Sequence, residues 1–288
     1  MSVTGQLKEY LELVKFEHSI FALPFALSGM LLAEPSGWPA PAVYFWVILA
    51  MVGGRTAAMA LNRLIDRDID RLNPRTSNRA IPAGRVKPLT AYLIVIVSIV
   101  IMSYAVFQLP PVCQYLLPVA LIIIWGYSYT KRFTLASHFV LGFVLGAAAI
   151  GGWLAVSGQI TIPVIIWGGA VMLWTAGFDI IYSTQDVDFD RHHNLFSLPA
   201  KIGTARALIV SRLCHLFTVL LLIITGFMIS MSVFYYIAVI FVAGMLYYEQ
   251  SLVSKDDLSR VNVAFFNING LVSIAVLVFI LLDKIIYL

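Results

Sequence analysis

Two short aspartate motifs are the part of this sequence best suited to chemistry. Six of the 15 acidic residues lie in Asp66–Asp70 and Asp186–Asp190, and each motif reads DxxxD. At about 100° per residue, a helix would present Asn62, Asp66 and Asp70 within roughly 80° on one face. Paired carboxylates repel each other unless a cation joins them, and oxygen ligands of this kind suit Mg²⁺ shared with a substrate phosphate. The motifs therefore predict divalent metal binding together with a phosphate-bearing substrate.

The repetition of the motif favours a metal site over the alternative that these are ordinary charged loops. For a single DxxxD, pairing of the carboxylates with neighbouring arginines stays open as the simpler interpretation. Both motifs, however, are followed within a dozen residues by Pro-Ala and a glycine, in Pro82–Gly84 and Pro199–Gly203. A weak internal repeat would bring both motifs to one cavity, where metals and basic residues would form a diphosphate site. These basic residues are Arg67, Arg71, Arg75, Arg79 and Lys201.

The elements that position the motifs are long apolar runs. Of the 288 residues, 60% are hydrophobic and only 12% are charged. A soluble domain of this size could not bury so many apolar side chains. The runs are also too long and unbroken for the alternating strands of a transmembrane β-barrel. Helices of about 20 residues cross a bilayer, and nine spans are predicted: Phe21–Ala33, Val43–Leu61, Leu89–Leu109, Val112–Tyr127, Phe139–Val156, Pro163–Tyr182, Leu208–Ile229, Val233–Tyr248 and Val263–Leu282.

The predicted fold is all-α, with one domain over residues 1–288 and nine transmembrane helices in two four-helix-like halves around a central cavity. Seventeen of the 19 Lys and Arg fall on one side of these spans, which the positive-inside rule makes cytoplasmic. The motifs open on that side, so the active site is expected to face the cytoplasm from the inner (plasma) membrane. Topology alone explains the net charge of +4; no nucleic acid partner and no obligatory protein partner are indicated.

These residues resemble the UbiA superfamily of intramembrane aromatic prenyltransferases, in the right order over essentially the whole chain. The family's NxxxDxxxD signature is matched by Asn62, Asp66 and Asp70, and its upstream arginine by Arg55, an ionisable group inside a span where such groups are costly and mark a functional cavity. The other matches are Arg75-Thr-Ser-Asn-Arg79-Ala-Ile-Pro82, Tyr127-Ser-Tyr129-Thr-Lys131-Arg132, the second signature Asp179, Tyr182, Asp186 and Asp190, and Asn267-Ile-Asn-Gly270.

The resemblance implies transfer of a polyprenyl group from polyprenyl diphosphate to a ring carbon of an aromatic acid, in ubiquinone or menaquinone biosynthesis. Mg²⁺ would be the cofactor, held by Asp66, Asp70, Asp186 and Asp190 with Asn62, and the bilayer would receive the prenyl tail. Asp179 would orient the acceptor or activate its hydroxyl, and Arg55 would pair with the acceptor carboxylate or with Asp66; Tyr182 completes the expected catalytic set. The expected substrate-binding residues are Arg67, Arg71, Arg79, Tyr129, Lys131, Lys201 and Asn267.

The aromatic acceptor is open between 4-hydroxybenzoate and a dihydroxynaphthoate. Many 4-hydroxybenzoate enzymes of the family have Tyr-Asp-Thr where this chain has Phe178-Asp179-Ile180. The segment Asp190-Arg-His-His-Asn-Leu-Phe-Ser197 is similar to the family branch associated with menaquinone made through futalosine.

Two other functional classes fit the pattern less well. A membrane phosphotransferase of the CDP-alcohol type also uses aspartates and a metal, but its acids lie in one segment, whereas these lie in two. A secondary transporter would place its charges near the bilayer midplane rather than at one face. Of the remaining polar or small residues, Gly142 and Gly146 form a GxxxG that predicts close helix packing, and His138 near a helix end predicts packing at the membrane interface.

Overall fold

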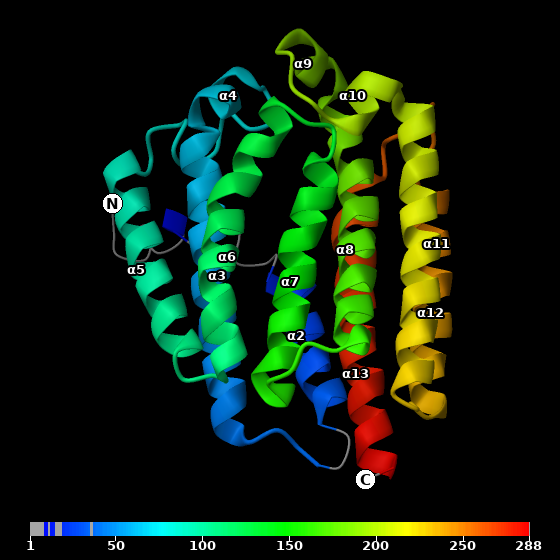
Figure 1. The fold of residues 1–288 in the computed structure, drawn as a ribbon. Coiled ribbons are helices and arrows are strands. Elements are labelled where there is room, and N and C mark those ends of the chain that lie inside the picture. Colours follow the sequence, from blue (N-terminus) through cyan, green and yellow to red (C-terminus); the bar gives the residue numbers. More distant parts are fainter. Residues whose placement is uncertain (1–8, 11, 15–18, 35–36, 288) are drawn as a thin grey trace. The chain divides into compact units, whose positions relative to one another are not determined.

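Every regular element in the computed structural model is helical across the residues that it describes, 9–10, 12–14, 19–34 and 37–287 (Figure 1). Eight helices of this part of the chain are long and apolar enough to cross a membrane. This confirms the all-α class of a polytopic membrane protein. The eight are α3 (Pro41–Ile65), α5 (Pro88–Val106), α6 (Pro111–Gly126) with the 3₁₀ turn η2 (Tyr127–Arg132), α7 (Ser137–Ser157), α8 (Ile162–Ser183), α11 (Thr204–Met228), α12 (Val233–Ser251) and α13 (Asn269–Tyr287) with the π-helix η4 (Val263–Ile268).

The first predicted span corresponds to α2 (Ser19–Ala33), which is apolar but has only 15 residues. At about 1.5 Å per residue this is roughly 22 Å, less than the ~30 Å hydrocarbon layer. The count of nine transmembrane helices is therefore not confirmed.

The chain divides into two compact units. The first contains residues 1–19 and 45–129, and the second contains residues 20–44 and 130–288. Three of the membrane-length helices, α3, α5 and α6, belong mainly or wholly to the first unit, and the other five belong to the second. The prediction of two four-helix-like halves around a central cavity is not confirmed by this division, and a single domain over residues 1–288 stays a prediction.

Proline and glycine set several helix boundaries. Pro88, Pro111 and Pro163 stand in the first turn of α5, α6 and α8, where the missing N–H of proline costs no helical hydrogen bond. α7 ends at Ser157, and the Gly158 N–H still donates to the Leu154 carbonyl at 2.9 Å. The φ of 65° at Gly158, which glycine adopts without strain, then turns the chain away from the helix. The short turns between predicted spans are thus encoded locally.

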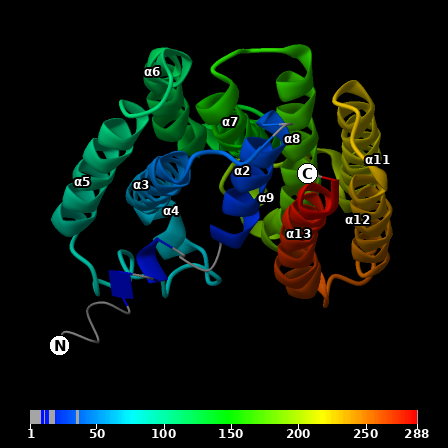
Figure 2. The same cartoon turned by 90° about the horizontal axis from the view of Figure 1, so that it is seen from below.

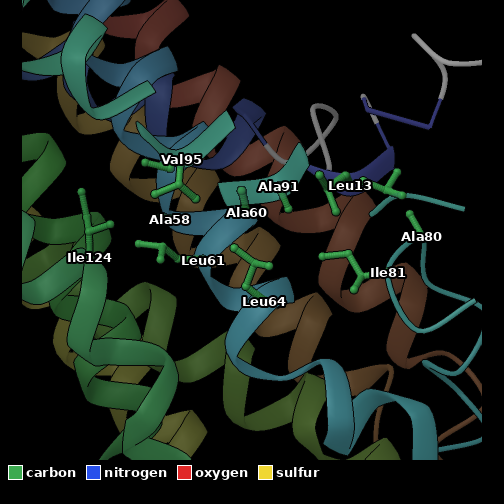
Figure 3. Close-up of a cluster of buried hydrophobic side chains, with 12 residues drawn as sticks. Leu13, Ala58, Ala60, Leu61, Leu64, Ala80, Ile81, Ala91, Val95 and Ile124 are labelled. Atoms are coloured by element: carbon green, nitrogen blue, oxygen red, sulfur yellow. The ribbon is translucent and has the colours of Figure 1, made fainter. Parts of the chain in front are cut away.

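The core of the first unit joins α3 to α5 and to the loop that follows α4 (Arg67–Leu72) (Figure 3). Small side chains of α3 allow a close approach, and a Cβ added at Gly53 would lie 2.8 Å from the Ser98 carbonyl oxygen of α5. In the same cluster, Ala80 and Ile81 of the loop lie with Leu64 near the end of α3, so the loop packs against the end of the helix that leads into the first aspartate motif. The labelled side chains of this cluster are Leu13, Ala58, Ala60, Leu61, Leu64, Ala80, Ile81, Ala91, Val95 and Ile124.

The second unit is built on α8, which packs against α7 and α11, while α12 lies against α11 and α13 (Figure 2). Gly142 and Gly146 of α7 face the backbone of α8, and a Cβ at Gly146 would lie 2.5 Å from the Gly168 carbonyl oxygen. Gly152 of the same helix meets the Ala26 carbonyl of α2 in the same way. The predicted role of the GxxxG in close helix packing is confirmed.

Replacing Gly146 with Val is expected to lower the free energy of unfolding by about 1–3 kcal/mol, because the new side chain must push α8 away. Gly151 offers a matched control on the same helix, since a Cβ there meets no atom within 4 Å. Thermal unfolding of the two purified variants in one detergent would measure the difference. Equal stability of Gly146→Val and Gly151→Val would contradict the close α7–α8 contact.

Candidate active site

The first aspartate motif spans a break between two helices. α3 ends at Ile65, Asp66 has φ −91° and ψ 0°, and α4 begins at Arg67. Helical hydrogen bonds nevertheless pass through the break, from Asp66 N–H to the Asn62 carbonyl at 2.9 Å and from Asp70 N–H to the Asp66 carbonyl at 2.7 Å. The expected continuous helix is interrupted, but the four-residue repeat of Asn62, Asp66 and Asp70 is kept.

Both carboxylates of the first motif are buried, with exposed fractions of 1% for Asp66 and 3% for Asp70. The Asn62 amide donates to Asp66 Oδ2 at 3.0 Å and to Ser128 Oγ at 3.2 Å. Arg79 Nη1 donates to both oxygens of Asp70 at 2.7 Å. The pairing of a motif carboxylate with a nearby arginine, which the sequence left open, is therefore present at Asp70.

Arg63 is a further cation beside the first motif, and it is not among the residues predicted from the sequence. It is buried, its Nη1 lies 3.4 Å from Asn62 Oδ1, and it interacts electrostatically with Asp66 and Asp70. Its spacing to those aspartates, three and seven residues, was the available signal, because it places all three on one helix face. Arg67, which was predicted instead, is partly exposed and pairs with the exposed Asp68 at 3.4 Å.

The loop after the first motif is tied to the start of the chain by Arg85. Its Nε donates to Glu9 at 2.8 Å and one Nη to Glu12 at 3.2 Å. The hydrogen bond to Glu9 raises the pKa of the Arg85 guanidinium above its usual value. Arg85 therefore stays a cation and restrains the loop that also carries Arg79.

The second motif repeats this arrangement. α8 ends at Ser183, the 3₁₀ turn η3 (Thr184–Asp186) follows, and α9 (Val187–His192) begins after Asp186, which has φ −108° and ψ 9°. α4 and α9 are each six residues long, and each buries the second aspartate of its motif, Asp70 or Asp190. The shared break and short helix support the predicted internal repeat. Figure 1 shows α9 at the end of α8, next to α10 (Leu198–Ile202).

The segment after the second motif is fixed to the start of α7. Phe196 N–H donates to the Lys131 carbonyl at 2.7 Å, and Ser137 Oγ donates to the Phe196 carbonyl at 3.2 Å. Lys201 Nζ lies 4.5 Å from the centroid of the Phe196 ring. Lys131 and Lys201, two of the expected substrate-binding cations, therefore belong to one local structure.

Asp179, near the end of α8, makes a hydrogen bond that the sequence did not indicate. Its Oδ2 lies 2.7 Å from His138 Nδ1, and His138 Nε2 accepts from the Leu198 N–H at 3.2 Å. The prediction that His138 serves interfacial packing is wrong, because the ring is buried and uses both nitrogens in polar contacts. His138 and Asp179 are 41 residues apart, so no local spacing could have joined them.

Tyr182 lies in an aromatic cluster of the second unit. Its ring stacks on Phe265 of the π-helix η4 with a centroid distance of 4.1 Å, and Phe178 and Phe21 also contact Phe265 at 5.3 and 5.5 Å. π-Helical turns are often found at functional sites. Buried apolar rings therefore lie next to Asp179 and Tyr182 in the chain and in space.

Asn267 and Asn269 at the last helix have different surroundings. Asn267 is exposed, and its role in substrate binding stays a prediction. Asn269 is fully buried, and its amide donates to Glu249 Oε1 at 2.9 Å and to the Ala264 and Phe265 carbonyls. Asn269 therefore holds η4 to α12.

The other predicted residues are distributed over both units. Arg55 is half-buried in α3, Arg71 is exposed in α4, and the Tyr129 ring contacts Trp125 at 5.3 Å. Arg55, Asn62, Asp66, Arg67, Asp70, Arg71, Arg79 and Tyr129 belong to the first unit, and Lys131, Asp179, Tyr182, Asp186, Asp190, Lys201 and Asn267 to the second. The convergence of both motifs on one cavity stays a prediction.

The donor chemistry of each motif fits Mg²⁺. Within the described part of the chain, no three or more His, Cys, Asp or Glu side chains form a group that could hold a metal. Each motif instead supplies a pair of carboxylates one helical turn apart. Mg²⁺ keeps several waters and commonly binds one or two carboxylates together with substrate phosphates, so a pair is sufficient for this mode of binding.

Known proteins of similar sequence place the chain in a family. The profile of the UbiA prenyltransferase family matches residues 22–271. The 4-hydroxybenzoate octaprenyltransferase of Tolumonas auensis is 28% identical over 276 residues, covering 93% of this chain and 94% of that protein. The 4-hydroxybenzoate octaprenyltransferase of Sodalis glossinidius is 29% identical over 270 residues, covering 91% and 92%.

Solved structures agree with this assignment. The apo structure of a UbiA homolog from Aeropyrum pernix K1 has a TM-score of 0.85 and 35% identity, covering 93% of this chain and 98% of that chain. A UbiA homolog from Archaeoglobus fulgidus bound to DMAPP and Mg²⁺ shares the fold, with a TM-score of 0.74 at 19% identity over 96% and 98% of the chains. The chain is an integral membrane enzyme of the prenyltransferase class. It belongs to the UbiA prenyltransferase family.

Proposed function

We propose that the chain transfers a polyprenyl group from polyprenyl diphosphate to a ring carbon of 4-hydroxybenzoate or a dihydroxynaphthoate, in ubiquinone or menaquinone biosynthesis. The observation that carries the proposal is the repeated motif, in which a DxxxD spans a helix break and buries its second aspartate in a six-residue helix. The names of the curated relatives support an aromatic acid as acceptor. The DMAPP and Mg²⁺ bound by the Archaeoglobus fulgidus homolog support a prenyl diphosphate as donor.

The reaction breaks the allylic C–O bond and forms a bond between the allylic carbon and the ring carbon, which loses its proton. The diphosphate leaves with the bonding electrons, so cations must stabilise its added charge. Charge-assisted hydrogen bonds from basic side chains suit its oxygens. The residues that we assign to the diphosphate are Arg67, Arg71, Arg79, Lys131 and Lys201.

Mg²⁺ binding is assigned to Asp66, Asp70, Asp186 and Asp190, with Asn62 as a further contact. When bound, the metal would neutralise the diphosphate and assist its departure. Arg79 orients the Asp70 carboxylate through its two contacts at 2.7 Å, and Asn62 orients Asp66 at 3.0 Å. These contacts hold the ligand oxygens in place before the substrate arrives.

The acceptor is assigned to the end of α8. Asp179 would receive a hydrogen bond from the acceptor hydroxyl, and Tyr182, one turn later, would line the site with Phe265, on which it stacks at 4.1 Å. Arg55 would pair with the acceptor carboxylate or with Asp66, and Tyr129 and Asn267 would complete the substrate contacts. Apolar rings at this point would keep water from the allylic cation.

The site is proposed to face the cytoplasm from the inner membrane, and the lipid bilayer is proposed to hold the prenyl tail. The support is the distribution of charge, since 17 of the 19 Lys and Arg lie on the side on which both motifs open.

Membranes containing the chain are expected to prenylate one of the two acids when given a polyprenyl diphosphate and Mg²⁺. The activity should be lost in EDTA, because the chelator removes the divalent cation that the motif carboxylates are proposed to bind. The measurement is chromatography of the product from parallel reactions with 4-hydroxybenzoate and a dihydroxynaphthoate. Restored activity on adding back Mg²⁺ is the control for the chelator. Full activity in EDTA would contradict the metal assignment, and no product from either acid would contradict the proposed reaction.

A further inference from the structure

His138 connects three elements of the second unit through one buried ring. It lies in the first turn of α7, its Nδ1 is 2.7 Å from Asp179 Oδ2 of α8, and its Nε2 is 3.2 Å from the backbone nitrogen of Leu198, where α10 begins. No other side chain described in this part of the chain joins Asp179 to the segment that follows the second motif.

The contact with Leu198 determines which nitrogen of His138 carries the proton. A backbone N–H only donates, so Nε2 must accept and carries no hydrogen. The proton of the neutral ring is therefore on Nδ1, which donates to Asp179 Oδ2. Both ring nitrogens of His138 therefore form a hydrogen bond, and only one orientation of the ring allows both bonds.

This bond leaves one oxygen of Asp179 available. The Asp179 side chain is 22% exposed while the His138 side chain is buried, and no residue that the structure describes makes a hydrogen bond to Asp179 Oδ1. His138 thus fixes the rotation of the carboxylate through Oδ2, which leaves Oδ1 of this partly exposed side chain as the oxygen that can accept a further hydrogen bond.

The second bond of His138 restrains the segment that carries Lys201. Leu198 follows Phe196, which is itself held by the Lys131 carbonyl and by Ser137. Residues 196–198 are therefore attached to residues 131–138 at three points. The ring of His138 is the only one of these three attachments that also contacts Asp179, among the residues described.

We propose that His138 is a positioning residue for the aromatic acceptor, acting through Asp179. Its Nδ1–H holds Asp179 Oδ2 so that Oδ1 is presented to the hydroxyl of the acceptor, and its Nε2 sets the place of α10 relative to that carboxylate. The inference rests on the proposed function and names the residue that prepares its acceptor subsite. Fixed geometry before binding is what makes such a contact effective.

Two conservative variants separate the two bonds. The amide of His138→Asn reaches the place of Nδ1 and keeps a donor for Asp179, whereas the amide of His138→Gln reaches the place of Nε2 and keeps an acceptor for Leu198. His138→Gln is expected to raise KM for the aromatic acid by about tenfold or more, with KM for the prenyl diphosphate unchanged. His138→Asn is expected to keep KM for the acid within about threefold of the wild-type value.

Nitrogen NMR of histidine-labelled protein provides a readout that does not depend on turnover. The wild-type spectrum is expected to contain a neutral ring protonated on Nδ1, and its signal should disappear in His138→Asn and shift in Asp179→Asn. A ring protonated on Nε2 at this position would overturn the proposal. Thermal unfolding of each variant shows whether a kinetic change comes from loss of structure.

Different results would overturn the role of His138 and the proposed function. A working enzyme in which His138→Gln and His138→Asn have equal KM values for the acid, or in which both substrates are affected equally, would overturn the role of His138 alone. Wild-type protein that prenylates neither acid would overturn the proposed function and the acceptor subsite with it.

Discussion

Asp66→Asn and Asp186→Asn are each expected to reduce prenyl transfer by about 10³-fold or more, because a neutral amide cannot neutralise a divalent cation and several kcal/mol of electrostatic stabilisation are lost. Asp68→Asn and Asp188→Asn are expected to keep activity within about twofold of the wild-type level. The four variants change the same group in the same short segments. Asp66 is buried, whereas Asp68 is exposed and pairs with Arg67 at the surface, and Asp188 is also exposed.

Initial rates at several Mg²⁺ concentrations in purified membranes would test this expectation. Asp70 is a poorer choice for substitution, since its carboxylate also holds Arg79 at 2.7 Å, and an amide there would leave a cation without its partner. Loss of activity in Asp68→Asn equal to that in Asp66→Asn would show that the motifs act through general charge. Activity retained in both Asp66→Asn and Asp186→Asn would contradict the assignment of the motifs to metal.

The helical fold could be predicted because it depends on properties that are local in sequence. Hydropathy locates the spans, and proline in the first turn of α5, α6 and α8 marks where they begin. The breaks at Asp66 and Asp186 could not be predicted, because the hydrogen bonds of a helix continue through the first of them and only the backbone angles depart. The sequence pattern therefore reads as an unbroken helix where the structure has two.

Arg63 and His138, which were not predicted from the sequence, differ in how strong a sequence signal each one has. Arg63 shares a helix face with Asp66 and Asp70, so the periodicity that selected the aspartates could also have selected it. His138 lies 41 residues from Asp179 and 60 from Leu198, and its role depends on the packing of α7 on α8. Tertiary contacts of this kind have no local signature, whereas a repeated motif does, and this is why the aspartates were found and the histidine was not.

The two asparagines of the last helix show how a change of helix type alters the surroundings of neighbouring residues. Asn267 and Asn269 are two residues apart, and an ordinary helix would place them on nearly opposite faces. The segment Val263–Ile268 is a π-helix, which has more residues per turn and changes the register of every later side chain. The buried contacts of Asn269 follow from this register, and the substrate-binding role that the resemblance implies for Asn267 stays a prediction.

Asn269→Leu is expected to lower the free energy of unfolding by about 3 kcal/mol, because it leaves an oxygen of a buried carboxyl group without a hydrogen-bond donor. Glu249 is fully buried in α12, and Asn269 donates to its Oε1 at 2.9 Å. His215 Nδ1 lies 4.0 Å from Glu249 Oε2, and it already has a hydrogen bond with Gln250 at 3.0 Å. Asn269 is therefore the single donor to Glu249 among the residues that the structure describes.

A double-mutant cycle would isolate this contact. In the background of Glu249→Leu the same Asn269→Leu change is expected to cost only about 1 kcal/mol, because no carboxyl group remains that needs a donor and only the Ala264 and Phe265 carbonyls lose a partner. The coupling of roughly 2 kcal/mol lies in the range found for residues in direct contact. Thermal or denaturant unfolding in detergent measures all four proteins on one scale.

Asn267→Leu is the matched control for Asn269→Leu, since it makes the same change two residues earlier at an exposed position. It is expected to leave the free energy of unfolding within about 0.5 kcal/mol of the wild-type value and to weaken substrate binding if the predicted role of Asn267 holds. A loss of stability in Asn267→Leu as large as in Asn269→Leu would contradict the register that the π-helix sets. A large loss for Asn269→Leu that persists undiminished in the Glu249→Leu background would instead show that the asparagine acts on the carbonyls of η4 and not on the carboxylate of α12.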